Sequence, residues 1–247
     1  NALAALRDHG RYGSPGPVLA SSENSNDSQA AREVIAQARE RGRTGLTEIE
    51  SRKIFAAYDL PVVDTRLARS EEEALDAAQD VGYPVVLKIV SHDILHKSDA
   101  GGVKVGIQNA QELSAAYQSL LKNAKQYKAE AVIEGVAVQE MAAEGTEVII
   151  GSVNDPTFGP TVMFGLGGIF VEVLEDTTFR VAPVSTSEAA SMLGEIRAAA
   201  ILEGARGKGP LDCEALAETL SRYSEMAADL GDDIAETDAN PCLVYEQ

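Results

Sequence analysis

Several features that direct a chain to a membrane or to an oxidising compartment are missing from this sequence. It contains two cysteines, Cys213 and Cys242, which are too few for a disulfide framework, and neither has the neighbours of a metal site. No segment approaches the roughly 18 apolar residues that a membrane-spanning helix needs. The first ten residues, NALAALRDHG, contain no hydrophobic core of a signal peptide. We therefore expect a cytoplasmic protein with no membrane partner.

Basic residues are also scarce, since 21 lysines and arginines face 39 acidic residues and the net charge is −18. Such a surface repels phosphate backbones, so we expect no nucleic-acid partner. Against this background, Lys88, Lys97 and Lys104 fall within one short stretch that also contains glycines. If the protein binds a polyanion, this stretch is the expected place.

The N-terminal part differs in composition from the rest of the chain. Residues 1–12 read as the end of a helix that belongs to a part upstream, and residues 13–28 are rich in Pro, Gly, Ser and Asn. Such a composition has little to bury and is typical of a linker. We expect the folded domain to occupy residues 29–247.

Helices are predicted from periodicity and from their capping residues. The apolar spacing predicts a helix over residues 29–42. Two further helices are predicted where a capping box, Thr47 with Glu50 and then Ser70 with Glu73, precedes a periodic segment. In a capping box, each side chain of the pair accepts a hydrogen bond from the other residue's backbone N–H, which stabilises the first turn.

Strands are predicted between these helices. Residues 84–90 form a β-branched run, as expected of a mostly buried strand. Two strand runs within residues 131–153 are adjacent in sequence, and we expect them to pair antiparallel. The segment 234–246 reads as a strand, a turn and a strand. The predicted class is therefore α+β, or mixed α/β, rather than a doubly wound parallel sheet.

Lys88 is unusual because it interrupts the apolar strand. Burying an ammonium group is costly unless it reaches water or an anion. Alternate strand residues face opposite sides, so Lys88 can point into a cleft, although a solvated lysine on an edge strand would explain it too. The segment that follows contains two histidines, two lysines and the pair Gly101–Gly102. Glycines let backbone N–H groups approach an anion closely, as phosphate-binding loops do.

Two other segments carry weaker signals. The glycine cluster in FGLGGIFVE (164–172) is neither a dinucleotide-binding fingerprint nor a Walker loop, and a tight turn explains it equally well. Asp238 and Asn240 lie two residues apart on a predicted strand, so their oxygens face the same side. Such a pair suits Mg²⁺, which accepts one or two protein ligands, although an Asx-turn is the alternative.

Taken together, these segments resemble the ATP-grasp part of NDP-forming acyl-CoA synthetases, the group of ADP-forming acetate–CoA ligases. The likeness covers roughly residues 29–247 and rests on four segments: 82–106, 138–185, 202–212 and 236–241. It implies two α+β lobes, at about 61–139 and 140–247, with a nucleotide cleft between them. The stub ALAALRDHGRYG also resembles the end of the CoA-ligase part in fused members. The β subunit of succinyl-CoA synthetase is a more distant likeness.

The resemblance also implies roles for individual residues. His96 would be a phosphohistidine that takes phosphate from a histidine on the CoA-binding part and delivers it to ADP, whereas His92 is read as a surface residue. Mg²⁺ would be held by Asp238 and Asn240. ATP or ADP would be contacted, through phosphates or adenine, by the following residues: Lys88, Gly101, Gly102, Glu140, Met141, Glu147, Gly165, Gly167, Gly168 and Arg180.

The expected function is therefore the nucleotide-binding, phosphoryl-transferring module of an ADP-forming acyl-CoA synthetase. The whole enzyme would bind CoA on the upstream part or subunit and would form an oligomer. Two alternatives stay open: a ligase that forms its acyl phosphate directly, without His96, and a non-catalytic nucleotide-sensing module of a protein acetyltransferase. The acid and the choice between ATP and GTP are not predicted. The family brings a further acidic residue toward the metal after the Asp-x-Asn-Pro turn, so we expect the metal site to be incomplete in a chain that ends at Gln247.

Overall fold

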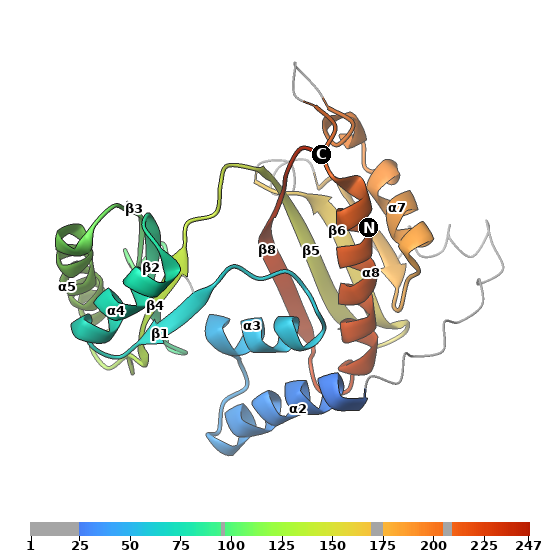
Figure 1. Ribbon diagram of the computed structural model, residues 1–247. Coiled ribbons are helices and arrows are strands. Elements are labelled where there is room, and N and C mark those ends of the chain that lie inside the picture. Colours follow the sequence, from blue (N-terminus) through green and yellow to red (C-terminus); the bar gives the residue numbers. More distant parts are fainter. Residues whose placement is uncertain (1–24, 95–96, 169–174, 205–208) are drawn as a thin grey trace. The chain divides into compact units, whose positions relative to one another are not determined.

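The computed structural model describes residues 25–94, 97–168, 175–204 and 209–247 (Figure 1). The chain divides into two compact units, which are described separately. Unit 1 contains the described parts of Asn1–Arg32, Ala57–Leu60 and Glu144–Gln247, and unit 2 contains Glu33–Ala56 and Pro61–Ala143. Each unit is built on one four-stranded antiparallel sheet.

Unit 2 has the strand order β1-β4-β2-β3. Its strands are β1 (Thr65–Ala68), β2 (Val85–Val90), β3 (Val103–Ile107) and β4 (Gly135–Glu140). Helices α4 (Glu71–Val81) and α5 (Ala110–Tyr127) contact these strands. One face of the sheet, which includes Leu87 and Val138, forms a buried apolar cluster with both helices. The alternate residues of β2 and β4 face the other side, which is called here the open face of unit 2.

Helix α3 (Glu48–Ala57) contacts the open face of this sheet. The Glu48 carboxylate accepts a hydrogen bond from Lys88 of β2, and Arg52 donates to the Gln139 side chain on β4. The capping box predicted for α3 is confirmed, because the Thr47 N–H donates to the Glu50 carboxylate at 2.8 Å and the Glu50 N–H donates to the Thr47 hydroxyl at 3.4 Å.

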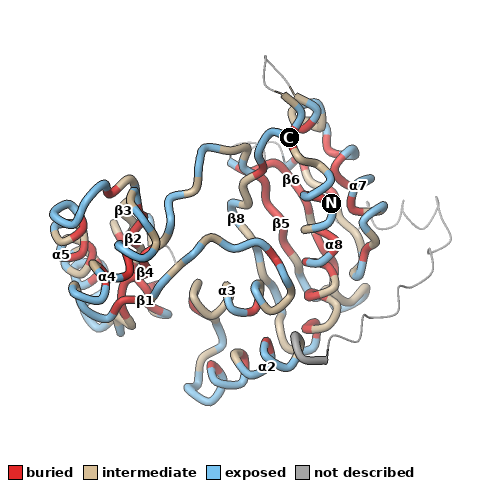
Figure 2. The backbone as a smooth tube through the Cα atoms, in the orientation of Figure 1, coloured by how far each residue is buried: buried red, intermediate tan, exposed pale blue. Residues whose placement is uncertain are grey.

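Unit 1 has the strand order β7-β6-β5-β8. Its strands are β5 (Thr146–Asp155), β6 (Gly159–Leu166), β7 (Thr177–Val181) and β8 (Glu236–Val244). Helices α7 (Thr186–Glu195) and α8 (Cys213–Asp229) contact this sheet, and a short 3₁₀ helix, Ala199–Ile201, lies between them in the sequence. The buried residues concentrate in β5, β6 and α8 (Figure 2). The face without helices is called here the open face of unit 1.

The fold corrects three of the predictions from sequence. Helix α2 (Ser25–Glu40) begins inside the expected linker 13–28, because Ser, Asn and Asp are common in linkers and equally common at helix starts. The two strand runs within 131–153 do not pair with each other. β4 pairs with β1 and β2, whereas β5 pairs with β6 and β8. Residues 141–145 therefore connect two sheets and do not form a hairpin.

The third correction concerns the C-terminal segment, which was expected to contain a turn. β8 is one strand from Glu236 to Val244, and Pro241 lies within it. The register against β5 shifts between Val148 and Ile150, next to the proline, and β8 is an edge strand. An edge position with an irregular register accommodates a residue that has no N–H to donate. In the described part of the chain, no helix is both long and apolar enough to cross a membrane.

Candidate functional site

Lys88 lies on the open face of unit 2, at the centre of its sheet. β2 is flanked by β4 and β3, so Lys88 is not on an edge strand. Its side chain is 23% exposed, and its ammonium group donates to Glu48 Oε1 at 3.0 Å. The alternative reading of Lys88 as a solvated edge lysine is therefore wrong.

Glu48 joins several cations and was not singled out from the sequence. Its Oε2 accepts a hydrogen bond from the Lys97 ammonium group at 2.7 Å, and its Oε1 accepts one from Arg52 at 2.9 Å. Burial raises the pKa of the Glu48 carboxyl, but Lys88 and Lys97 more than offset this and hold it at about 2. Glu48 is thus ionised and gathers two lysines from β2 and from the segment after it. The capping box predicted that a helix begins at Glu48. No local feature of the sequence indicated that this end of the helix would lie on the open face of unit 2.

The Gly101–Gly102 pair forms a close turn against β2. The Gly102 carbonyl accepts a hydrogen bond from the Ile89 N–H at 2.8 Å, and its N–H donates to the Lys97 carbonyl at 2.7 Å. A Cβ atom at Gly102 would lie 2.7 Å from the side chain of Ile89, and Gly101 has a φ of +59°. Both positions therefore require glycine on structural grounds, and their phosphate-binding role stays a prediction.

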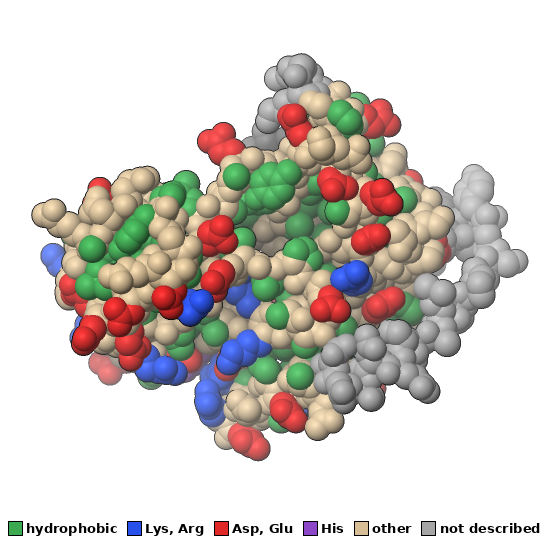
Figure 3. Space-filling model, in the orientation of Figure 1, with side chains coloured by type: hydrophobic (Ala, Val, Ile, Leu, Met, Phe, Trp, Pro, Cys, Tyr) green, Lys and Arg blue, Asp and Glu red, His purple; other side chains and the backbone are tan. Residues whose placement is uncertain are grey.

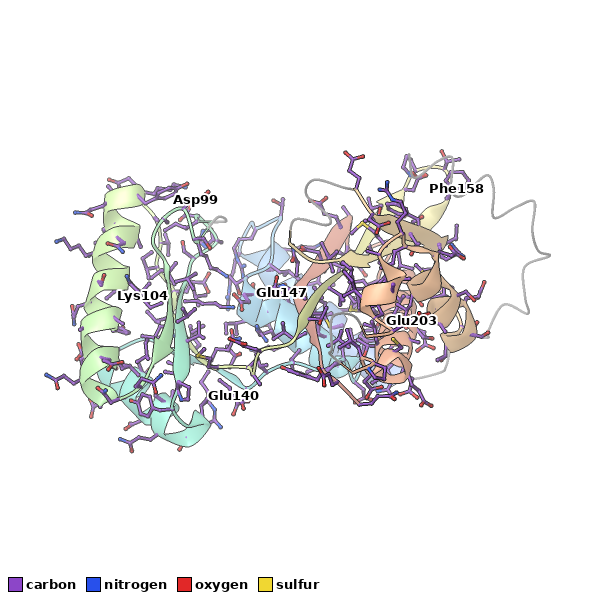
Figure 4. The ribbon with its side chains drawn as sticks, turned by 90° about the horizontal axis from the view of Figure 1, so that it is seen from above. Asp99, Lys104, Glu140, Glu147, Phe158 and Glu203 are labelled. Atoms are coloured by element: carbon purple, nitrogen blue, oxygen red, sulfur yellow. The ribbon has the colours of Figure 1, made fainter. Side chains whose placement is uncertain are left out.

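Glu140 and Met141 lie at the end of β4, where Figure 4 labels Glu140. The Glu140 N–H donates to the Asp64 carbonyl at 3.0 Å, and the Met141 N–H donates to the Pro84 carbonyl at 3.3 Å. Both N–H groups are thus engaged within unit 2, and a contact to adenine through them would require their release. The Met141 side chain is exposed.

The segment after β2 contains two histidines, His92 and His96. His96 lies outside the described residues. His92 was read as a surface residue, and its side chain is 35% exposed. Its Nδ1 lies 3.3 Å from the Glu134 carboxylate and its Nε2 lies 3.7 Å from the Asp93 carboxylate.

Glu147 and Gly167 are brought together in unit 1, where Figure 4 shows Glu147 at the beginning of β5. The Gly167 N–H donates to the Glu147 carbonyl at 2.8 Å, and a Cβ atom at Gly167 would lie 2.9 Å from the Glu147 Cβ. Gly165 pairs with Ile149 in the sheet, and Gly168 follows with a φ of +60°. Gly167 of the glycine cluster therefore lies beside Glu147, and the nucleotide-binding role of both stays a prediction.

Asp238 lies on the open face of unit 1. It is opposite Gly151, and a Cβ atom at Gly151 would lie 3.9 Å from the Asp238 Cβ. Burial raises the pKa of the Asp238 carboxyl, and the nearby Glu236 raises it further. Within the described part of the chain, no hydrogen bond or ion pair engages this carboxylate. Because Asp238 and Asn240 lie within β8, the Asx-turn alternative is wrong.

This pair fits a hard cation that keeps most of its other ligands. Asp238 is an exposed residue. A carboxylate without a partner is a favourable ligand for a cation, and Mg²⁺ takes one or two protein oxygens together with phosphate and water. The residues that the structure describes contain no group of three His, Cys, Asp or Glu side chains arranged to hold a metal. Asp238 and Asn240 would therefore hold Mg²⁺ only together with the phosphates of a ligand.

Arg180 does not join this site in unit 1. In β7 it is opposite Val162, a fully buried core residue, and it shares its face with Thr178, whose hydroxyl donates to the Met192 carbonyl of α7. The Arg180 guanidinium pairs with Glu195 at the end of α7. Asp238 lies on the other face. The register of β7 thus places Arg180 on the opposite face of the sheet from Asp238, the predicted metal ligand.

Comparisons with known proteins assign the chain to a family. The model of the ATP-grasp domain family matches residues 37–247. The β subunit of the ADP-forming acetate–CoA ligase I of Pyrococcus furiosus is 48% identical over 216 residues, 87% of this chain and 92% of that subunit. The 4-hydroxybutyrate–CoA ligase (ADP-forming) of Nitrosopumilus maritimus is 45% identical over 88% of this chain but 31% of its own length.

Solved structures agree with this assignment. A protein of Pyrococcus horikoshii is 45% identical, with a TM-score of 0.86 over 89% of this chain and 93% of its own. The dinucleotide-forming acetyl-coenzyme A synthetase 1 of Ca. Korarchaeum cryptofilum, with coenzyme A and Mg-AMPPCP bound, is 43% identical, with a TM-score of 0.74 over 87% of this chain and 93% of its own. In that complex, a phosphohistidine segment points towards the nucleotide-binding site. The chain described here belongs to the ATP-grasp domain family, as the nucleotide-binding module, similar to the β subunit, of an ADP-forming acyl-CoA synthetase.

Proposed function

We propose that this chain binds Mg-ATP and Mg-ADP and transfers a phosphoryl group between the nucleotide and His96. Two observations support the proposal, one within each unit. The Lys88 ammonium group is held in place by Glu48 in unit 2, and the Asp238 carboxylate has no partner among the described residues of unit 1. An ammonium group suits phosphate oxygens, and a carboxylate suits the metal that accompanies them.

The overall reaction would convert an acid, CoA and ATP into an acyl-CoA, ADP and phosphate, and the reverse. In the direction of ATP synthesis, the P–N bond of phosphorylated His96 breaks while a P–O bond forms to the terminal phosphate of ADP. Such transfer demands mainly positioning and charge neutralisation, which Lys88, the glycines and a bound Mg²⁺ supply. A neutral imidazole is nucleophilic near pH 7 and is therefore a suitable carrier.

The partner would be the CoA-binding part of the same enzyme, either as a separate subunit or fused to this chain. Support comes from relatives of both kinds, because this chain spans 92% of a β subunit and 31% of a longer ligase. The relatives act on acids as different as acetate and 4-hydroxybutyrate, according to their names. This fits an acid-binding pocket that lies on the CoA-binding part.

The test is phosphorylation of the complete enzyme with γ-phosphate-labelled ATP. The wild-type enzyme should carry an acid-labile, base-stable phosphate. His96→Ala should lose that label and the overall synthesis of acyl-CoA, while its affinity for Mg-ADP stays within about twofold. His92→Ala, a matched histidine substitution four residues away, should keep the label. If His96→Ala turns over near the wild-type rate, the relay is wrong and direct formation of an acyl phosphate replaces it.

A further inference from the structure

Unit 2 contains a second feature, a cavity of about 470 Å³ to which neither Lys88 nor the Gly101–Gly102 turn belongs. It is lined by residues 41–48, which connect α2 to α3, and by five residues at and after the end of β2: Val90, Ser91, His92, Ile94 and Lys97. Cavities of this size hold small organic ligands. All the lining residues belong to unit 2, so the cavity is a property of that unit alone.

The lining is basic in a chain that is strongly acidic. It includes Arg41, Arg43 and Lys97 against one carboxylate, Glu48, although the whole chain has 39 acidic residues and 21 basic ones. In Figure 3, several lysine and arginine side chains lie near the connection between α2 and α3. An excess of cations in one concave place raises the local concentration of small anions.

The three cationic side chains of the cavity differ in whether they already have hydrogen-bond partners. Arg43 is held by Glu50 through two hydrogen bonds, one of them 2.8 Å long, and Lys97 is held by Glu48. Arg41 is exposed, and no hydrogen bond or ion pair engages its side chain among the described residues. Its planar guanidinium can donate two parallel hydrogen bonds to a phosphate group.

The backbone of the same connection offers further donors. No hydrogen bond to a described residue engages the N–H groups of Thr44, Gly45 and Leu46. A Cβ atom at Gly45 would meet nothing within 4 Å, so the backbone there is open to a ligand. Unengaged N–H groups beside an arginine form a set of donors that matches the several acceptor oxygens of a phosphate.

We propose that this cavity binds a phosphate group, either as free phosphate or as part of a small phosphorylated metabolite. Arg41 and the N–H groups of residues 44–46, which have no hydrogen-bond partner among the described residues, are its ligands, and Lys97 contributes charge from the lining. The site is distinct from the nucleotide ligands proposed above and does not depend on them. The remaining volume and the apolar side chains of Leu46, Val90 and Ile94 accommodate the organic part of a metabolite.

The location is tested by anomalous diffraction from crystals of the full chain soaked with tungstate, a heavy analogue of phosphate. The structure predicts a peak beside Arg41 that is absent from crystals of Arg41→Glu. Affinity is then measured by equilibrium titration of the full chain at constant ionic strength, with saturating Mg-AMPPCP present to occupy any nucleotide site. Orthophosphate and glycerol 3-phosphate serve as separate probes.

Arg41→Glu should weaken binding of both probes at least tenfold, and Lys97→Gln should also weaken it. Arg69→Glu, which changes an exposed arginine of unit 2 that does not line the cavity, should leave binding unchanged. Tighter binding of glycerol 3-phosphate than of orthophosphate would identify a phosphorylated metabolite as the ligand, and equal binding would identify free phosphate. A tungstate peak elsewhere, or Arg41→Glu binding like wild type, overturns the proposal. If Mg-AMPPCP itself fails to bind, the nucleotide assignment fails while the cavity is still tested.

Discussion

The two open faces differ in how their central charges are balanced. In unit 2 the Lys88 ammonium group is matched by Glu48, and the same carboxylate also holds Lys97 and Arg52. In unit 1 Asp238 is exposed and its carboxylate has no hydrogen-bond or ion-pair partner among the described residues; desolvation raises the pKa of this carboxyl, and Glu236 raises it further. The central charge of unit 2 is therefore matched within that unit, whereas the carboxylate of unit 1 is available to a cation. The comparison shows that Asp238, unlike Glu48, lacks a cationic partner among the described residues, which is why the proposed metal is assigned to unit 1.

The largest expected effect is that of Asp238→Asn on metal-dependent nucleotide binding. Loss of the carboxylate should weaken binding of Mg-ADP on the order of 100-fold, because a neutral amide is a poor ligand for Mg²⁺. Titration calorimetry at fixed Mg²⁺ measures this. Glu236→Gln removes a charge two residues away on the same strand and should change the affinity much less. Equal losses in both variants would mean that general charge, and not ligation, is responsible.

The same substitution should stabilise the protein when Mg²⁺ is absent. The pKa of Asp238 is raised in the folded protein, so the folded state binds this proton more tightly than the unfolded state does. The ionised carboxylate therefore costs stability at neutral pH, and this cost disappears as the pH falls through the raised pKa. Asp238→Asn should raise the free energy of unfolding at pH 7 and have less effect near pH 4. A loss of stability at pH 7 would contradict the account of this face.

Lys88→Ala comes next in size. A lysine that meets phosphate in a partly dry site contributes about 1.5–3 kcal/mol, which corresponds to roughly 10- to 100-fold in affinity. Lys53→Ala and Lys125→Ala are matched controls, since both lysines are exposed, on α3 and α5, and should change affinity less than about twofold. If all three variants bind Mg-ADP equally well, the role of Lys88 is confined to its pair with Glu48.

Glu48→Gln tests the balanced charges of unit 2 through their dependence on pH. The pKa of Glu48 is lowered from its ordinary 4.5 to about 2, so its ion pairs contribute fully above pH 4.5 and are lost as the pH falls toward 2. The contribution is on the order of 3 kcal/mol. Wild type should therefore lose more stability than Glu48→Gln between pH 5 and pH 2, as measured by denaturant unfolding. Parallel curves for the two proteins would show that the pairs contribute nothing.

Arg180→Ala should have the smallest effect on nucleotide binding. The arginine lies on the helix-covered face of unit 1 with Glu195, so its removal should lower thermal stability modestly and leave the affinity for Mg-ADP within about twofold. Differential scanning calorimetry and the same titration give the two readouts. A tenfold loss of affinity without a loss of stability would restore Arg180 to the phosphate site.

Features of the fold that depend on neighbouring residues were predicted from the sequence, whereas features that depend on pairing between distant segments were not. The Thr47–Glu50 capping box, the position of Lys88 inside a strand, and the α+β class all follow from spacing and residue type, and the structure confirms them. The Ser70–Glu73 box forms by half: the Ser70 side chain caps α4, but the Glu73 carboxylate accepts from the Arg69 N–H. The pairing of β4 and β5 was predicted wrongly, because adjacency in sequence says nothing about residues 141–145 crossing to another sheet. The partnership of Glu48 with Lys88 and the face of Arg180 were out of reach for the same reason, since each is set by pairing between distant segments.

The most direct test of the central claim is a calorimetric titration of the chain with ADP, with and without Mg²⁺. The account predicts saturable binding at one site that requires both Mg²⁺ and Asp238 and is weakened by Lys88→Ala. Removal of Mg²⁺ should weaken binding to wild type strongly but have little further effect on Asp238→Asn. Absence of binding at millimolar Mg-ADP, or the same affinity with and without Mg²⁺, would contradict the claim that Lys88 and Asp238 are ligands of a magnesium nucleotide.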